Sequence, residues 1–113
     1  MIQQSKVLGT LGLAMRAGDI ACGEFLTEEA IRSGRARLVI VAEDASDNTK
    51  KKFRNSCQYY RVPFALYGSK ETLGKAVGKE FRASMAVLNP GFAASIGKNL
   101  DLEEKVNGEN ENI

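Results

Sequence analysis

Apolar residues recur at helical spacing in several segments of the chain, and short unbroken apolar runs separate these segments. In the first segment the apolar residues share one helix face: Val7, Leu8, Leu11, Ala14 and Met15. Gly18 is suited to end this helix in a left-handed conformation. Gly9 and Gly12 lie inside the helix, where glycine costs about 1 kcal/mol relative to alanine. We therefore expect both glycines to allow close packing against a neighbouring element.

A second helix is predicted from Gly23 to about Ser33, where Gly34 closes it. Before it, residues 20–22 form a short extended segment that we expect at the edge of a sheet. Three residues of this helix are expected to face the core: Leu26, Ala30 and Ile31.

Three further helices are predicted downstream, each beginning after a capping residue. The caps are Ser46 or Asp47, then Ser69, then the turn at 89–91. The residues expected to pack inward are Phe53, Cys57 and Tyr60 in the first of them, Leu73, Ala76 and Val77 in the second, and Phe92, Ile96 and Leu100 in the third. Gly78 is expected to end the second of these helices.

Unbroken apolar runs between the helices predict strands. Residues 38–42 are Leu-Val-Ile-Val-Ala, a pattern typical of a strand covered on both faces. Residues 64–67 and 83–88 predict two more strands. Strands that alternate with helices indicate an α/β fold, and we expect a three-layer α-β-α sandwich with a small mixed sheet of about four strands. Residues 1–100 would form a single domain, followed by an acidic, flexible tail at 101–113.

Charge is unevenly distributed along the chain. The formal net charge is +2, but residues 1–100 carry 15 basic and 9 acidic residues, whereas the last 13 residues have a net charge of −4. A basic body suits a polyanionic partner.

The residues and motifs that metal binding, nucleotide binding and catalysis usually require are missing from the sequence. The chain has no histidine, and its two cysteines, Cys22 and Cys57, do not form a CxxC motif, so we expect no metal site. We expect two reduced, buried thiols, and the alternative is a single disulfide in a secreted protein. Phosphate-loop, dinucleotide-binding and nucleophile-elbow motifs are also missing. We therefore expect no catalytic residues, no cofactor and no enzymatic activity. No signal peptide or membrane-spanning run is recognisable, which predicts a cytoplasmic protein.

Three places could contact nucleic acid, and each has a simpler explanation. The run Lys50-Lys51-Lys52-Phe53-Arg54 could neutralise phosphates, or it could be a solvated helix face. Gly23 at a helix start could present backbone N–H groups to an anion or a base edge, or it could form a tight turn. Phe81, between cations in the loop 79–82, could stack on an unpaired base or fill the core.

Two motifs carry a resemblance to a known family. Residues 34–45 resemble the strand motif G-x-A-x-L-V-x-x-A-x-D-A of the kink-turn-binding ribosomal proteins of the L7Ae and L30e type. Residues 69–78 match the family's S-K-x-x-L-G-x-A-x-G completely, and both Val62-Pro63-Phe64 and residues 86–92 continue the likeness, which covers about residues 5–98. The opening at residues 11–17 is most similar to the bacterial YlxQ-like branch of RNA-binding proteins.

The resemblance implies an α-β-α sandwich that binds a kink-turn, a sharply bent RNA helix with sheared G·A pairs. It implies that residues 23–27 read guanines, that the loop 79–82 covers a flipped-out base, and that residues 46–50 make a third contact. Together with the basic run, the candidate RNA-binding residues are Gly23, Glu24, Phe25, Thr27, Ser46, Thr49, Lys50, Lys51, Arg54, Lys79, Glu80, Phe81 and Arg82.

The chain departs from the family pattern at one place. Where archaeal and eukaryotic members have Asn-Glu-x-x-Lys, this chain has Phe25, Leu26 and Glu29. Glu24 and backbone amides would then recognise the guanines in place of the Asn-Glu pair. The leading interpretation is a monomeric protein that binds kink-turn or ribosomal RNA and associates with the ribosome. Two alternatives are a protein–protein adaptor with the same fold and a detached substrate-recognition domain of the kind fused to RNA methyltransferases.

Overall fold

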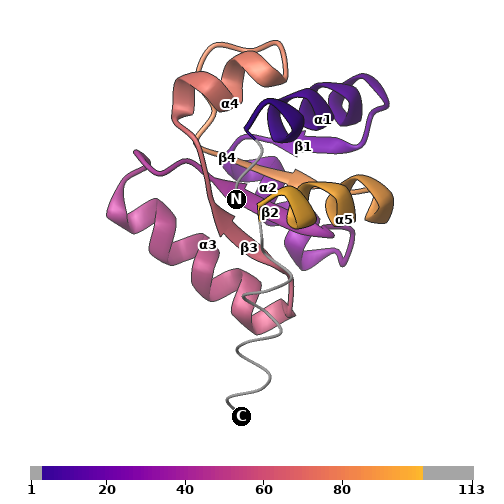
Figure 1. Cartoon of the computed structure of the whole chain (residues 1–113). Coiled ribbons are helices and arrows are strands. Elements are labelled where there is room, and N and C mark those ends of the chain that lie inside the picture. Colours follow the sequence, from indigo (N-terminus) through magenta and orange to yellow (C-terminus); the bar gives the residue numbers. More distant parts are fainter. Residues whose placement is uncertain (1–3, 101–113) are drawn as a thin grey trace.

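Helices and strands alternate along the part of the chain that the computed structural model describes, residues 4–100, with side chains from residue 6 onward. The elements are α1 (Gln4–Arg16), β1 (Ile20–Cys22), α2 (Glu24–Arg32), β2 (Leu38–Val41), α3 (Asp47–Tyr60), β3 (Phe64–Leu66), α4 (Lys70–Ala76), β4 (Ser84–Val87) and α5 (Pro90–Asn99) (Figure 1). The acidic tail expected at 101–113 lies outside the described residues.

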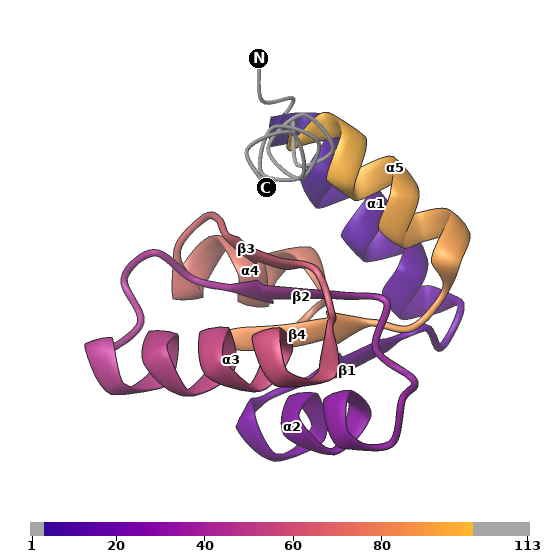
Figure 2. The same cartoon turned by 90° about the horizontal axis from the view of Figure 1, so that it is seen from below.

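The four strands form one mixed sheet in the order β1-β4-β2-β3. β4 runs antiparallel to both β1 and β2, and β2 runs parallel to β3. Helices α2 and α3 cover one face of the sheet, and α1, α4 and α5 cover the other (Figure 2). This is the three-layer sandwich with a small mixed sheet that the sequence predicts, and β1 is the edge strand expected at residues 20–22.

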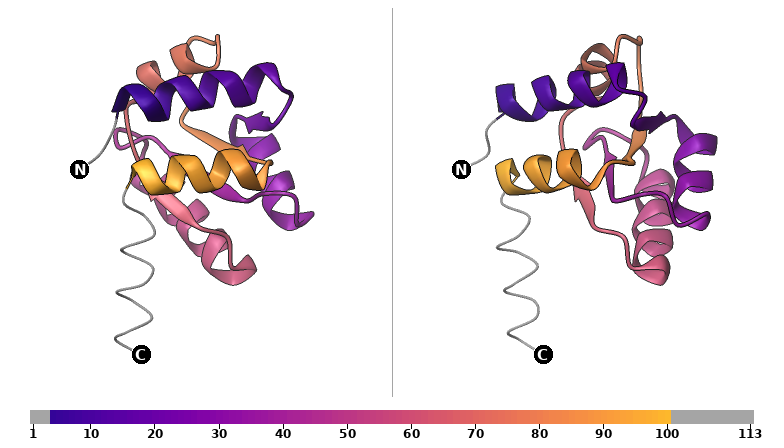
Figure 3. Two further views of the ribbon diagram at one scale, coloured as in Figure 1. Left: turned by 45° about the vertical axis from the view of Figure 1, so that its right-hand side comes forward. Right: turned by 90° about the vertical axis from the view of Figure 1, so that its right-hand side faces the viewer.

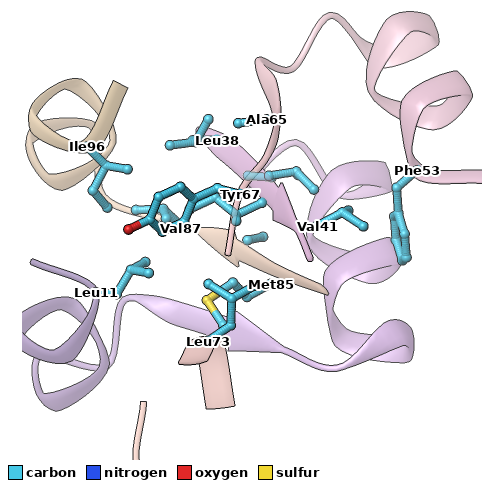
Figure 4. Packing of buried hydrophobic residues seen from close by; sticks show 14 of the residues in the cluster. Leu11, Leu38, Val41, Phe53, Ala65, Tyr67, Leu73, Met85, Val87 and Ile96 are labelled. Atoms are coloured by element: carbon cyan, nitrogen blue, oxygen red, sulfur yellow. The ribbon is translucent and has the colours of Figure 1, made fainter. Parts of the chain in front are cut away.

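The two central strands are completely buried, because helices cover them from both sides. Every residue of β2 and of β4 is buried, and Ala42, the last residue of the predicted central strand, is buried just beyond the end of β2. Leu11, Leu73 and Ile96 from three helices pack around these strands, Met85 belongs to β4 itself, and Phe53 of α3 fills the layer between that helix and the sheet (Figure 4). The apolar run at 38–42 thus marks a doubly covered strand, whereas the run at 64–67 belongs to the edge strand β3, where Leu66 is exposed.

The helix ends follow the predicted capping chemistry. Ser46 Oγ accepts a hydrogen bond from Thr49 N at 3.1 Å, and Asn89 Oδ1 accepts one from Gly91 N at 2.7 Å. Ser69 and Thr72 form a reciprocal capping box. The glycines expected to end helices have positive φ: Gly18, Gly34 and Gly78.

Three predictions about packing are wrong. Leu26 is 45% exposed, because the buried stripe of α2 consists of Thr27, Ala30 and Ile31. Tyr60 is 42% exposed. It is the last residue of α3, so no further helical turn follows to cover its side chain. Gly9 faces open space, whereas a Cβ on Gly12 would lie 3.1 Å from Ala76 O, so only Gly12 allows a close approach.

Candidate nucleic-acid interface

Three segments of the chain meet at one edge of the sheet. β1 and β2 end where β4 begins, since β4 is antiparallel to both. Gly23 N donates a hydrogen bond to Ser84 O, and Ala42 N donates one to Ala83 O, each at 2.9 Å. The start of α2, the loop before α3 and the loop 79–82 therefore emerge together, and we call this region (residues 23–26, 43–51 and 79–82) the strand-end edge. Figure 3 shows it from two sides.

The loop 79–82 is fastened to α4 by its backbone. Lys79 N donates to Gly74 O at 2.8 Å, and Arg82 N donates to Lys70 O at 3.0 Å. The loop lies so close to α4 that a Cβ added to Gly74 would sit 2.1 Å from Glu80 O. The loop is thus held in place from both ends, and Gly74 is the residue that makes room for it.

Phe81 projects from this loop into solvent. Its side chain is 60% exposed, so the alternative in which it fills the core is wrong. Phe25, in the first turn of α2, is 72% exposed. Phe25 is two residues after Gly23 and Phe81 is three residues before Ser84, so both rings belong to the segments that the hydrogen bond between Gly23 and Ser84 brings together. Two apolar ring faces are therefore available at the strand-end edge.

The start of α2 depends on a glycine. Gly23 has φ 96° and ψ 161°, a conformation that side chains rarely adopt, and it caps the helix without a side-chain hydrogen bond. Gly23 O accepts the first helical hydrogen bond, from Thr27 N at 3.0 Å. The amides of Glu24, Phe25 and Leu26 precede that bond and have no intrahelical acceptor, as in the first turn of any helix.

Thr27 does not belong to the exposed surface. Its side chain is fully buried, and its Oγ1 donates to Ala21 O at 3.4 Å. The family resemblance implies an RNA contact here because it maps residues 23–27 as one segment. In the helix, however, Thr27 turns inward with Ala30 and Ile31. We therefore exclude the Thr27 side chain from the interface.

A salt bridge joins the start of α2 to α3. Lys52 Nζ lies 2.8 Å from Glu24 Oε2 and 3.6 Å from Glu28 Oε1. The hydrogen bond to Glu24 raises the pKa of Lys52, with further contributions from the charges of both glutamates and an opposing effect of desolvation. Glu24 is therefore held at the strand-end edge by a cation from another helix, a pairing that no sequence pattern indicated.

The basic run 50–54 does not form a single helix face, contrary to our expectation. Consecutive helical residues are about 100° apart, so a run of five surrounds the helix. Lys52 turns toward α2, and the Arg54 guanidinium lies 5.4 Å from the centre of the Phe64 ring on β3. Lys51 is exposed and Lys50 is half-buried.

The loop before α3 is well ordered by hydrogen bonds. Ser46 and Thr49 use their side chains in the helix cap, where Ser46 Oγ donates to Thr49 Oγ1 at 3.0 Å. Asp44 Oδ1 accepts a hydrogen bond from Lys70 N at 2.8 Å, which ties this loop to the start of α4. The strand-end edge thus combines the cations Lys50, Lys51, Lys79 and Arg82 with the carboxylates Glu24, Glu43, Asp44, Asp47 and Glu80.

Both cysteines are free thiols in the structure. Cys57 is buried beneath α3, and burial raises its pKa to about 12. Cys22 is only half-buried on the edge strand β1. Within residues 4–100, no three His, Cys, Asp or Glu side chains come together as metal ligands, and no helix there is long and apolar enough to cross a membrane.

Comparison with known proteins identifies the family. The model of the ribosomal protein L7Ae/L30e/S12e/Gadd45 family matches residues 5–96. The chain belongs to this family. The chain is 46% identical over 91 residues to RNA-binding protein YlxQ of Bacillus subtilis, a match that covers 80% of this chain and 91% of that protein. It is 35% identical over 85 residues to the large ribosomal subunit protein eL30 of Methanoregula boonei, covering 73% and 84%.

A solved structure has the same fold as this chain. A protein of unknown function from Bacillus halodurans superposes with a TM-score of 0.83 at 36% sequence identity. That alignment covers 85% of this chain and 97% of the other. The family resemblance inferred from residues 34–45 and 69–78 is therefore confirmed.

Proposed function

We propose that this chain binds structured RNA of the kink-turn type through the strand-end edge. Support comes from its family, from the name of its relative YlxQ, an RNA-binding protein, and from the ribosomal relative eL30. These names favour RNA over the adaptor alternative. The observation that carries the proposal is the hydrogen bond from Gly23 N to Ser84 O, which brings the helix start and the loop 79–82 to one place.

Each part of the edge has a distinct role in this proposal. Glu24 accepts hydrogen bonds from a guanine edge, with the amides of the first turn of α2 beside it. Gly23 lets the RNA backbone approach closely. Phe81 stacks on an unpaired base, and Phe25 supplies further apolar surface.

Cations around the edge would hold the RNA backbone. Lys79 and Arg82 are placed for phosphates beside the base on Phe81, and Lys50 and Lys51 for phosphates beyond α3. Ser46, Thr49 and Glu80 lie in the same segments and would line the contact. Arg54 is farther along α3, so its role is limited to backbone phosphates. We further propose that the protein acts as a monomer on ribosomal RNA in the cytoplasm, by binding and without catalysis.

A titration with two RNAs tests the proposal. One contains a kink-turn, and the other is a straight duplex of equal length and charge. We expect tighter binding to the kink-turn at every salt concentration, because only a bent helix presents guanine edges and an unpaired base to the same edge. Equal affinity for the two RNAs would reduce the proposal to unspecific phosphate binding, and no binding to either RNA would reject it.

A further inference from the structure

The last turn of α3 carries a second group of exposed aromatic side chains, remote from the strand-end edge. Tyr59 is 80% exposed and Tyr60 is 42% exposed, with their rings edge-to-face and 4.9 Å between centroids. Both lie in the last turn of α3. Solvated tyrosine rings of this size gain little from their position unless something covers them.

The surroundings of these tyrosines are basic. No Asp or Glu occurs from Asn48 to Lys70, a segment that includes Arg54 and Arg61. Arg61 ends α3 in a left-handed conformation with φ 60°, and Arg54 lies over the Phe64 ring. Arg61 directly follows the two exposed tyrosines, and without a carboxylate in this segment it favours a partner that is both anionic and flat.

This tyrosine patch (Tyr59, Tyr60 and Arg61) is continuous with the strand-end edge. Lys51, Asn55 and Tyr59 are spaced by four residues along α3, and all three are exposed, so they lie on one line of the helix surface. From Lys51 to Tyr59 this line is roughly 12 Å long. A nucleic acid strand that leaves the strand-end edge at Lys51 would reach the tyrosines within a few nucleotides.

We infer that the last turn of α3 is a second RNA contact, which takes unpaired nucleotides flanking the structured element. Tyr59 stacks on a base, and Arg61 binds the adjoining phosphate. This inference rests on the proposed function. Two copies of this chain related by a two-fold axis would bring Arg54 and Arg61 close to the same residues of the partner copy, so like-charge repulsion disfavours a homodimer at this surface.

The test compares one kink-turn RNA in two forms, blunt and with five single-stranded adenosines added at either end. For the wild-type chain, we expect the extension at one end to improve affinity about tenfold through stacking and phosphate contacts. Tyr59→Ala should abolish this gain and leave affinity for the blunt RNA unchanged. Tyr59→Phe should keep the gain, because the ring remains. Gln58→Ala, a neighbouring exposed residue without a ring, is the matched control and should behave as wild type.

The other outcomes overturn the inference. If the blunt RNA binds but neither extension improves affinity, or if the gain survives Tyr59→Ala, α3 makes no second RNA contact while the proposed function stands. If no form of the RNA binds, both fail together. If sedimentation shows a dimer that Tyr59→Ala dissociates, the patch belongs to a second copy instead. The exposure of Tyr59 predicts an unchanged melting temperature for every variant, which separates these results from misfolding.

Discussion

The interior of the sheet and the strand-end edge are built on the same strands, but phenylalanine is buried in the first and exposed in the second. Phe53, beneath α3, is fully buried, whereas Phe81, in the loop before β4, is 60% exposed. Phe53 packs against the apolar layer that helices complete on both sides of β2 and β4. Phe81 is held outward by a loop whose backbone is bonded to α4. The comparison shows that the strand ladder creates a core along its length and a rigid exposed surface at its end.

Stability and binding should therefore be separable by residue. The largest expected effect is Phe53→Ala, which should lower the free energy of unfolding by about 3–5 kcal/mol because it leaves a cavity. Phe81→Ala should change it by no more than about 0.5 kcal/mol. Chemical denaturation of the two variants measures both values. Similar losses for the two would mean that Phe81 is a core residue after all.

The second test moves the loop without touching its side chains. Gly74→Ala places a Cβ against Glu80 O, a backbone atom that cannot rotate away, so we expect a loss of about 1–3 kcal/mol in stability. RNA affinity should fall with it, because Phe81 and Lys79 move. Gly9→Ala is the matched control, since its Cβ meets open space within a helix, and it should stabilise by up to about 1 kcal/mol. A Gly74→Ala variant as stable as wild type, with unchanged affinity, would show that the loop position is irrelevant.

The cations of α3 provide a test of binding alone. The double substitution Lys50→Ala, Lys51→Ala should flatten the slope of log affinity against log salt by about 2, because two phosphate contacts are lost. The melting temperature should stay close to that of wild type. Lys52→Ala is the informative comparison, because Lys52 is paired with Glu24, and its loss should weaken kink-turn binding more than duplex binding. If the slope of log affinity against log salt is unchanged in the double variant, Lys50 and Lys51 make no phosphate contacts and are only solvated side chains.

The smallest expected effect concerns Cys57. Burial raises its pKa from 9.0 to about 12, so the neutral thiol is the form that folding favours. Its contribution to stability is complete below about pH 9 and is lost as the pH rises toward 12. Cys57→Val should therefore reduce the alkaline decline in unfolding free energy over this range, measured by denaturation at stepped pH. Rapid alkylation of Cys57 in the folded protein at pH 8 would contradict its burial.

The sequence predicted the layers of the fold because those depend on long patterns. Residues 38–42 could be assigned to a buried strand without a structure, and Ser46, Ser69 and Asn89 could be recognised as helix caps. Packing at helix surfaces was less predictable. Leu26 and Thr27 differ by one position, and the buried one is the threonine, because its hydroxyl can donate to Ala21 O. Hydrophobicity alone could not rank them.

The candidate interface was predicted only in part, because its geometry depends on contacts between distant segments. That the helix start and the loop 79–82 meet follows from the antiparallel pairing of β1 with β4, which no local pattern shows. The pairing of Lys52 with Glu24 spans 28 residues. The sequence left two alternatives for Phe81, stacking on a base or filling the core. Only the position of the loop relative to α4 decides between them.

The most direct test of the account is the affinity of Phe81→Ala for kink-turn RNA, measured together with its melting temperature. If the strand-end edge binds RNA with Phe81 under an unpaired base, affinity should fall by about 1–3 kcal/mol, while the melting temperature remains close to that of wild type. Affinity equal to wild type in a folded Phe81→Ala protein would contradict the central claim that this exposed ring is part of the RNA-binding surface.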